Sequence, residues 1–112
     1  MFAWLTSMFE QPPVSPELKK SIESTVASNK VVVYSKTYCP YCRATKDLLS
    51  RYGVSYELIE LDTIEDGATI QRALEEITGQ RTVPNIFING KHIGGNSDLQ
   101  NLNQSNKLKQ LL

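Results

Sequence analysis

The sequence predicts a single α/β domain in which a four-stranded mixed sheet is flanked by helices. Short β-prone runs alternate with segments of helical apolar spacing, in the order helix, strand, helix, strand, helix, strand, strand, helix. The first two strands are joined through a helix, so a right-handed crossover makes them parallel. The last two flank Asn89-Gly90, the strongest short hairpin signal, and are therefore antiparallel.

The first helix begins at Ser15-Pro16-Glu17, which supplies a side-chain cap, a first-turn proline and an early acid. Apolar residues at four-residue spacing predict its buried face: Leu18, Ile22 and Val26. The first strand follows over 31–34. Its continuous apolar run is typical of a strand that is covered on both faces.

The middle of the chain continues the alternation. A helix that begins at Pro40 and stops at Gly53 is expected to bury four apolar residues: Ala44, Leu48, Leu49 and Tyr52. A second strand is expected over 56–61. A third helix over 66–77, ending before Gly79, is expected to bury a further four: Ile70, Ala73, Leu74 and Ile77.

The C-terminal third contains the hairpin strands 86–88 and 91–93 and a closing helical segment from about 97 to 112. A break in this helix is expected near Ser105-Asn106. No repeat, linker or low-complexity stretch interrupts residues 15–112. We therefore expect one domain over 15–112, preceded by an extension over 1–14.

The extension is apolar and aromatic over residues 1–11, with one acid. Phe2, Leu5 and Phe9 could form one face of a helical turn on the body of the protein; a loosely held tail is the alternative. The segment lacks the positive start of a secretory signal and the arginines of a mitochondrial transit peptide. We therefore expect a cytoplasmic protein, with a mitochondrial pool as the alternative.

The charges balance, with 12 basic and 12 acidic residues. This balance argues against electrostatic capture of nucleic acid or of an anionic membrane. No apolar run approaches the roughly 18 residues that span a bilayer. We expect a soluble monomer without a nucleic-acid or membrane partner.

The two cysteines, Cys39 and Cys42, form a C-x-x-C motif between a strand and a helix. A bridge across two residues hardly restricts the unfolded chain, so its value is chemical, and a reducing compartment is its natural setting. Cys39 stands at the N-cap of a helix, where free backbone N–H groups and the helix dipole favour an anion. The attacking thiolate is therefore assigned to Cys39, and the resolving thiol to Cys42, one turn into the helix and less exposed.

Three basic residues, Lys36, Arg43 and Lys46, add positive charge near this motif. The alternatives are half of a zinc site, or two incidental structural cysteines. Zinc needs four ligands, and only His92, expected as an exposed hairpin residue, remains as another soft ligand. Placement between strand and helix favours redox chemistry.

Two further segments are candidates for substrate binding. A cis peptide before Pro84 would expose a backbone edge beside the thiol. The alternative, which is the more common in proteins, is an ordinary proline at the start of a strand. The stretch 94–98 could place a helix N-terminus against a carboxylate, or it could be a turn and a helix cap.

Together, the stretches 35–42, 82–84 and 94–98 resemble a dithiol glutaredoxin, most similar to the cytosolic and mitochondrial members of fungal type. The resemblance covers about residues 17–112 and implies the thioredoxin fold with an extra N-terminal helix. It implies a glutathione-dependent oxidoreductase that reduces protein–glutathione mixed disulfides and protein disulfides. Glutathione would be the co-substrate, and glutathione reductase would reduce the glutathione disulfide that forms. No metal would be needed.

The resemblance also implies roles for individual residues. Cys39 would carry glutathione as a mixed disulfide. Lys36 and Gln71 would meet the glycine carboxylate of the tripeptide, and Tyr41 would line the groove.

For the rest of the tripeptide, the resemblance implies backbone pairing between Val83, ahead of a cis Pro84, and the cysteine part of glutathione, with Thr82 alongside. Ser97 and Asp98 would hold the γ-glutamyl end, the backbone N–H meeting its carboxylate and Asp98 its amine.

Two other functions compete with this one. A [2Fe–2S] module would use Cys39 of two copies and two glutathiones. In the family that behaviour is typical of members with a glycine and one cysteine in the motif, and Pro40 argues against it here. A thioredoxin-like reductase served by a flavoprotein is the nearer rival. Lys36, Tyr41 and Asp98 favour glutathione because they suit a small zwitterionic peptide.

Overall fold

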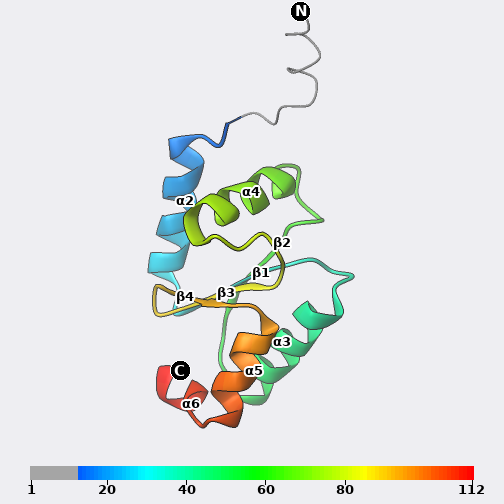
Figure 1. Ribbon diagram of the computed structural model, residues 1–112, viewed down its shortest axis with the longest axis vertical. Coiled ribbons are helices and arrows are strands. Elements are labelled where there is room, and N and C mark those ends of the chain that lie inside the picture. The colour runs from blue at the N-terminus through cyan, green and yellow to red at the C-terminus, as the bar shows by residue number, and fades with distance from the viewer. Residues whose placement is uncertain (1–12) are drawn as a thin grey trace, which may run out of the picture.

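The computed structural model describes residues 13–112 (Figure 1). Its elements are α2 (Pro16–Ser28), β1 (Val31–Ser35), α3 (Pro40–Arg51), β2 (Glu57–Glu60), α4 (Gly67–Thr78), β3 (Asn85–Ile88), β4 (Lys91–Gly94), α5 (Asn96–Gln104) and α6 (Leu108–Leu111). The predicted order is confirmed, and the closing helix breaks between α5 and α6, where the break was expected. The expectation for Phe2, Leu5 and Phe9 falls outside the described residues.

The four strands form one mixed sheet in the order β2-β1-β3-β4. β1 is parallel to β2 and antiparallel to β3, and β3 is antiparallel to β4. The β3–β4 turn has positive φ at both Asn89 (52°) and Gly90 (77°), as a tight two-residue hairpin requires. The predicted α/β fold of thioredoxin type, with α2 ahead of the first strand, is confirmed.

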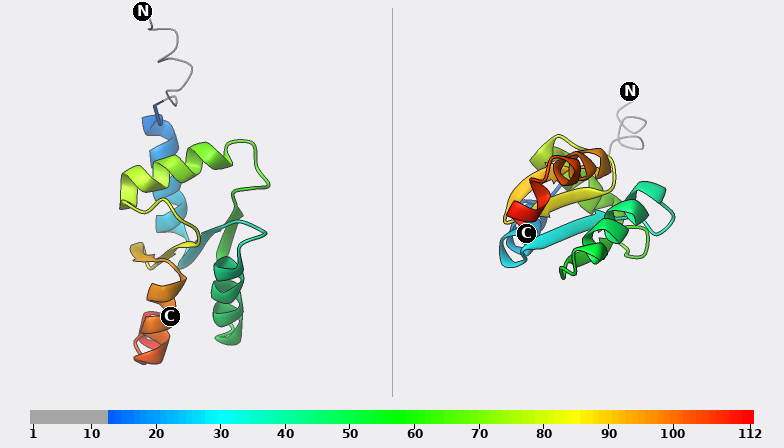
Figure 2. Two further views of the ribbon diagram at one scale, coloured as in Figure 1. Left: turned by 45° about the vertical axis from the view of Figure 1, so that its right-hand side comes forward. Right: turned by 90° about the horizontal axis from the view of Figure 1, so that it is seen from below.

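Helices cover both faces of the sheet. α2 and α4 lie on one face and α3, α5 and α6 on the other (Figures 1 and 2). All five residues of β1 are buried because side chains alternate between two apolar cores. Val32 and Tyr34 pack into the core under α2 and α4, whereas Val31 and Val33 pack into the core under α3 and α5.

Several local expectations differ from the structure. Ile77 is 36% exposed, contrary to the prediction, because it flanks an open hollow at the end of α4 instead of packing on the sheet. In α3, Ala44 is only half-buried, and Thr45 is buried in its place. The Thr45 hydroxyl is satisfied there, since Oγ1 donates to Asn96 Oδ1 at 3.0 Å.

Val14, just ahead of the predicted domain, is 9% exposed and packs in the core with Ile22 and Val26. No helix within 13–112 combines the length and the hydropathy that crossing a membrane requires.

Candidate active site

Cys39 lies where β1 gives way to α3, at the N-cap of the helix. Its Sγ accepts a hydrogen bond from the backbone N–H of Cys42 at 3.3 Å. The sulfur therefore takes the place that a serine or aspartate oxygen takes at other helix starts, where an anion is favoured. On its other side, Sγ lies 3.8 Å from the carbonyl oxygen of Val83.

Cys42 is fully buried, whereas Cys39 is partly exposed, as the sequence predicted for the pair. Burial raises the pKa of the Cys42 thiol to about 11, and its hydrogen bond with Cys39 acts in the same direction. Cys42 is thus protonated at neutral pH. Only the Cys39 sulfur is open to a substrate.

The loop between β1 and Cys39 is held by Asp62, which the sequence analysis missed. The backbone N–H of Thr37 donates to Asp62 Oδ1 at 3.0 Å, and the Thr37 hydroxyl donates to Oδ2. These hydrogen bonds hold the pKa of the Asp62 carboxyl below its usual range. A usable signal existed: Asp62 follows β2, and the carboxyl ends of parallel neighbours meet at one edge of the sheet.

Basic and acidic side chains lie together on one side of the thiol. A hollow of about 470 Å³ is lined by Thr37, Tyr38, Cys39, Pro40, Arg43, Lys46 and Asp47. Lys46 Nζ is paired with Glu60 Oε2 of β2 at 2.9 Å. Its charge is therefore shared with a carboxylate, which weakens the field expected from Lys46 at the thiol.

A second groove, of about 450 Å³, adjoins Cys39 through Val83. It is lined by Tyr41, Gln80, Thr82, Val83, Pro84, Gly95, Asn96, Ser97 and Asp98. Six of the predicted site residues thus meet in one groove. The Val83–Pro84 peptide is cis, the less common of the two readings of this proline.

The far end of the groove is the start of α5. Asp98 Oδ2 accepts a hydrogen bond from the Gly95 N–H at 2.9 Å, so the carboxylate folds back over the helix start. A Cβ on Gly94 (φ 121°) would lie 2.2 Å from the same oxygen. Glycine at position 94 therefore leaves the space that the Asp98 carboxylate occupies.

Lys36 and Gln71 are not among the residues that line this groove. Lys36 lies in the β1–α3 loop, where its carbonyl oxygen accepts from the Cys39 N–H at 3.1 Å. Gln71, in α4, donates from Nε2 to the Arg81 carbonyl oxygen at 2.8 Å. In this structure Gln71 supports the chain segment that leads into Thr82.

Gln80 is a groove residue for which the sequence carried no signal. Its side chain lies between the loop 82–84 and β4, and its contacts depend on the fold alone. Within residues 13–112, no cluster of three or more His, Cys, Asp or Glu side chains is arranged to hold a metal ion.

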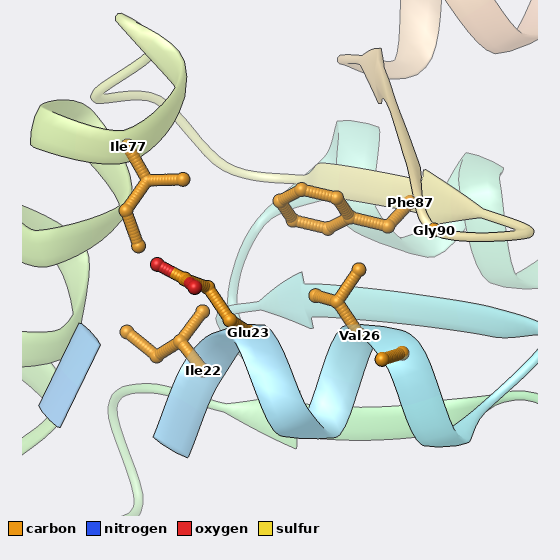
Figure 3. Close-up of a pocket in the computed structure, with 7 residues that line it drawn as sticks. Ile22, Glu23, Val26, Ile77, Phe87 and Gly90 are labelled. Carbon is orange, nitrogen blue, oxygen red and sulfur yellow. The ribbon is translucent and has the colours of Figure 1, made fainter. Parts of the chain in front are cut away.

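A separate apolar hollow of about 200 Å³ lies between α2, α4 and the β3–β4 hairpin (Figure 3). Ile22, Val26, Ile77 and Phe87 line it, and Glu23 places a carboxylate among them. The pairing of Val31 with Ile88 places this hairpin turn at the amino end of β1, whereas Cys39 follows the carboxyl end. The hollow is therefore separate from the thiol site.

Comparison with known proteins agrees with this geometry. The glutaredoxin family model matches residues 31–93. A glutaredoxin of Vernicia fordii is 53% identical over 90 residues, covering 80% of this chain and 86% of its own. Glutaredoxin-1 of Saccharomyces cerevisiae is 50% identical over 103 residues, covering 88% and 94%.

The solved structure of a buckwheat glutaredoxin in complex with glutathione superposes with a TM-score of 0.82 at 46% identity, over 88% of this chain and 93% of that one. Three findings agree: the family model matches, the relatives are about half identical over most of their length, and the fold is shared together with a close cysteine pair. This chain belongs to the glutaredoxin family of glutathione-dependent oxidoreductases.

Proposed function

We propose that this protein reduces protein–glutathione mixed disulfides through Cys39, with glutathione as the co-substrate. The observation that carries the proposal is the position of Cys39 Sγ, which caps α3 and lies 3.8 Å from the Val83 carbonyl at one end of the groove. That groove has a volume of about 450 Å³ and is lined by polar residues such as Ser97 and Asp98, which suits a small peptide. The buckwheat relative, solved with glutathione, supports the choice of peptide.

In the first step the Cys39 thiolate attacks the glutathione sulfur of the mixed disulfide. The new Cys39–glutathione disulfide forms as the old S–S bond breaks, and the protein thiolate leaves and takes up a proton. A second glutathione thiolate then attacks the glutathione sulfur on Cys39. Glutathione disulfide leaves, and the Cys39 thiolate is restored.

For protein disulfides, Cys42 would attack the Cys39 mixed disulfide and leave a Cys39–Cys42 bridge, which two glutathiones reduce. The buried Cys42 thiol, with its pKa raised to about 11, is slow to supply the necessary thiolate. External glutathione therefore competes well for the mixed disulfide when the substrate is itself glutathionylated. Cys42 is needed for protein disulfides only.

We assign the groove contacts by the same reasoning. Val83 offers its backbone to the cysteine part of the tripeptide. Ser97 and Asp98 at the start of α5 receive the γ-glutamyl end, which suits the free N–H groups and the carboxylate there. The glycine carboxylate is proposed to accept hydrogen bonds from Lys36 and from the Gln71 amide, whose other proton is donated to the Arg81 carbonyl oxygen.

Finer assignments are also proposals. Residues 15–112 are the glutaredoxin domain and 1–14 an extension. The Cys39-Pro40-Tyr41-Cys42 motif and the yeast relative support a dithiol member of fungal type, beside plant relatives such as that of Vernicia fordii. A monomer in a reducing compartment such as the cytosol, served by glutathione reductase and acting on protein substrates, fits a thiol that must be re-reduced.

The test is NADPH consumption with glutathione, glutathione reductase and the mixed disulfide of glutathione with a small thiol. We expect turnover by the wild type and by Cys42→Ser, and none by Cys39→Ser. For a protein disulfide, Cys42→Ser should be inactive as well. Turnover by Cys39→Ser would contradict the assignment. Reduction only with thioredoxin reductase, or a coloured cluster after anaerobic reconstitution, would favour the corresponding rival function.

A further inference from the structure

The backbone around Val83 is held by one side chain, Gln80. Its Nε2 lies 3.0 Å from the Thr82 carbonyl oxygen and 2.9 Å from the Pro84 carbonyl oxygen. An amide nitrogen has two protons, so both are used on the carbonyls that flank Val83. The Val83 carbonyl between them is the one that faces Cys39 Sγ.

These contacts also determine which way the Gln80 amide points. Because its nitrogen faces two carbonyl oxygens, its oxygen must be the atom that faces His92 Nε2, 3.2 Å away. An amide oxygen only accepts hydrogen bonds. His92 Nε2 must therefore carry a proton and donate it to Gln80 Oε1.

The His92 side chain is held from two sides. Gln80 contacts its Nε2, and the Phe87 ring lies against the imidazole at 5.3 Å between centroids. Burial lowers the pKa of His92, and the nearby Asp98 carboxylate partly opposes that effect. A neutral imidazole with its proton on Nε2 makes the bond to Gln80 at neutral pH.

Gln80 is anchored at its backbone as well. Its N–H donates to the Thr78 hydroxyl at 3.0 Å, just after α4 ends. The side chain thus spans from the end of α4 to β4, and crosses the loop that carries Val83. The two hydrogen bonds from Gln80 to the loop restrict where the Val83 backbone can lie.

We propose that Gln80 is a positioning residue of the glutathione groove, which holds the Val83 backbone in register with Cys39, and that His92 keeps the Gln80 amide in the required orientation. This inference rests on the proposed function, since the substrate in its kinetic test is a glutathione mixed disulfide. Neither residue reacts. Their effect is on how the substrate's backbone pairs with Val83 and where its sulfur comes to lie.

The kinetic test compares Gln80→Met and Gln80→Glu with the wild type, using the mixed disulfide of glutathione and a small thiol. Loss of two neutral hydrogen bonds should raise KM about threefold to tenfold, with a smaller change in kcat. Gln80→Glu should be worse than Gln80→Met although its shape is closer, because it turns an acceptor oxygen toward two carbonyl oxygens. Gln110→Glu, on the exposed face of α6, is the control for added negative charge.

His92→Phe keeps an aromatic ring against Phe87 and removes both ring nitrogens, including the Nε2–H that donates to Gln80. It should raise KM in the same direction, and its effect should be smaller in a Gln80→Met background than alone. Additive effects, or a KM for Gln80→Met equal to that of the wild type, would overturn the proposal. A Gln80→Glu variant that outperforms Gln80→Met would also overturn it, because a role in filling space predicts that order.

A second measurement needs neither a variant nor turnover. His92 is the only histidine in the chain, so its ring nitrogens are unambiguous in a ¹⁵N spectrum. Above the His92 pKa we expect a single tautomer with the proton on Nε2. A proton on Nδ1, or a mixture of tautomers, would contradict the proposed orientation of Gln80. Absence of wild-type turnover would refute the proposed function and leave this spectrum as the separate test.

Discussion

The backbone N–H of Cys42 donates to the Cys39 sulfur across 3.3 Å, and the same helical turn buries the Cys42 thiol completely. One turn of α3 therefore separates the two thiols chemically. Cys39 receives a donor where negative charge must form, and Cys42 loses the water that would stabilise its thiolate. Cys39 is therefore suited to attack a substrate disulfide, and Cys42 stays protonated until it is needed to resolve a mixed disulfide on Cys39.

The raised pKa of Cys42 predicts a loss of stability at alkaline pH. In the unfolded chain the thiol ionises near its ordinary pKa of 9.0, but in the folded protein only near 11. Its contribution is therefore complete below about pH 9 and is lost as the pH rises toward 11, by roughly 2–3 kcal/mol. Tyr34, whose pKa is raised to about 12, should add to the loss above about pH 10.

Urea unfolding of the wild type and of Cys42→Ala under reducing conditions separates the two groups. At about pH 8 the variant should be the less stable, since it leaves a small cavity. At about pH 10.5 the difference in unfolding free energy should shrink, because only the wild type has a thiol to ionise at position 42. Parallel curves across this range would show that Cys42 is not the titrating group.

Removal of the Asp62 carboxylate should slow the enzyme with little effect on stability. Asp62→Ala takes away the acceptor of both Thr37 hydrogen bonds and frees the loop just before Cys39. We expect kcat/KM for the mixed disulfide to fall several-fold, while Tm changes by only a few degrees because the side chain is exposed.

Asp66→Ala is the matched control for Asp62, as Asp66 is also exposed and its side chain makes no capping hydrogen bond. Because the pKa of Asp62 is lowered, its carboxylate stays ionised well below neutrality. The effect of Asp62→Ala should therefore persist at about pH 5 and fade only when the pH falls through the lowered pKa. Equal activity of the two variants would exclude a role for the Thr37 hydrogen bonds.

Gly67→Ala should be strongly destabilising. A Cβ at this position would lie 1.7 Å from the Leu61 carbonyl oxygen, so either the start of α4 or the turn after β2 must move. The cost should exceed the about 1–3 kcal/mol of ordinary overpacking. Ala68→Gly, at the exposed neighbouring position, should cost only about 1 kcal/mol in thermal unfolding. Comparable losses for the two variants would refute the close approach.

The elements that the sequence predicted are those with a local cause. Ser15 was expected to cap α2, and its Oγ accepts from the Leu18 N–H at 3.1 Å. The apolar run that forms β1 and the Asn89-Gly90 turn likewise depend on neighbouring residues alone. The Cys39 cap follows from its place ahead of Pro40, because a helix start offers the same N–H groups wherever it occurs.

The parts that sequence reasoning missed depend on which segments the fold brings together. Asp62 bonds Thr37 across 25 positions, and His92 faces Gln80 across 12, so no short pattern contains either pair. Ile77 has helical spacing like Ile70 and Leu74, yet it is exposed because it flanks an open hollow near the end of α4. Periodicity states which face of a helix is apolar, and packing decides how far along the helix that face is covered.

The central claim is that Cys39 alone accepts glutathione, and trapping of the mixed disulfide tests it most directly. Cys42→Ser and Cys39→Ser, each reduced and then treated with glutathione disulfide at neutral pH, would be compared by intact mass. We predict one glutathionyl group on Cys42→Ser, removed again by added glutathione, and none on folded Cys39→Ser. Modification of Cys39→Ser at a similar rate, or none on Cys42→Ser, would contradict the account.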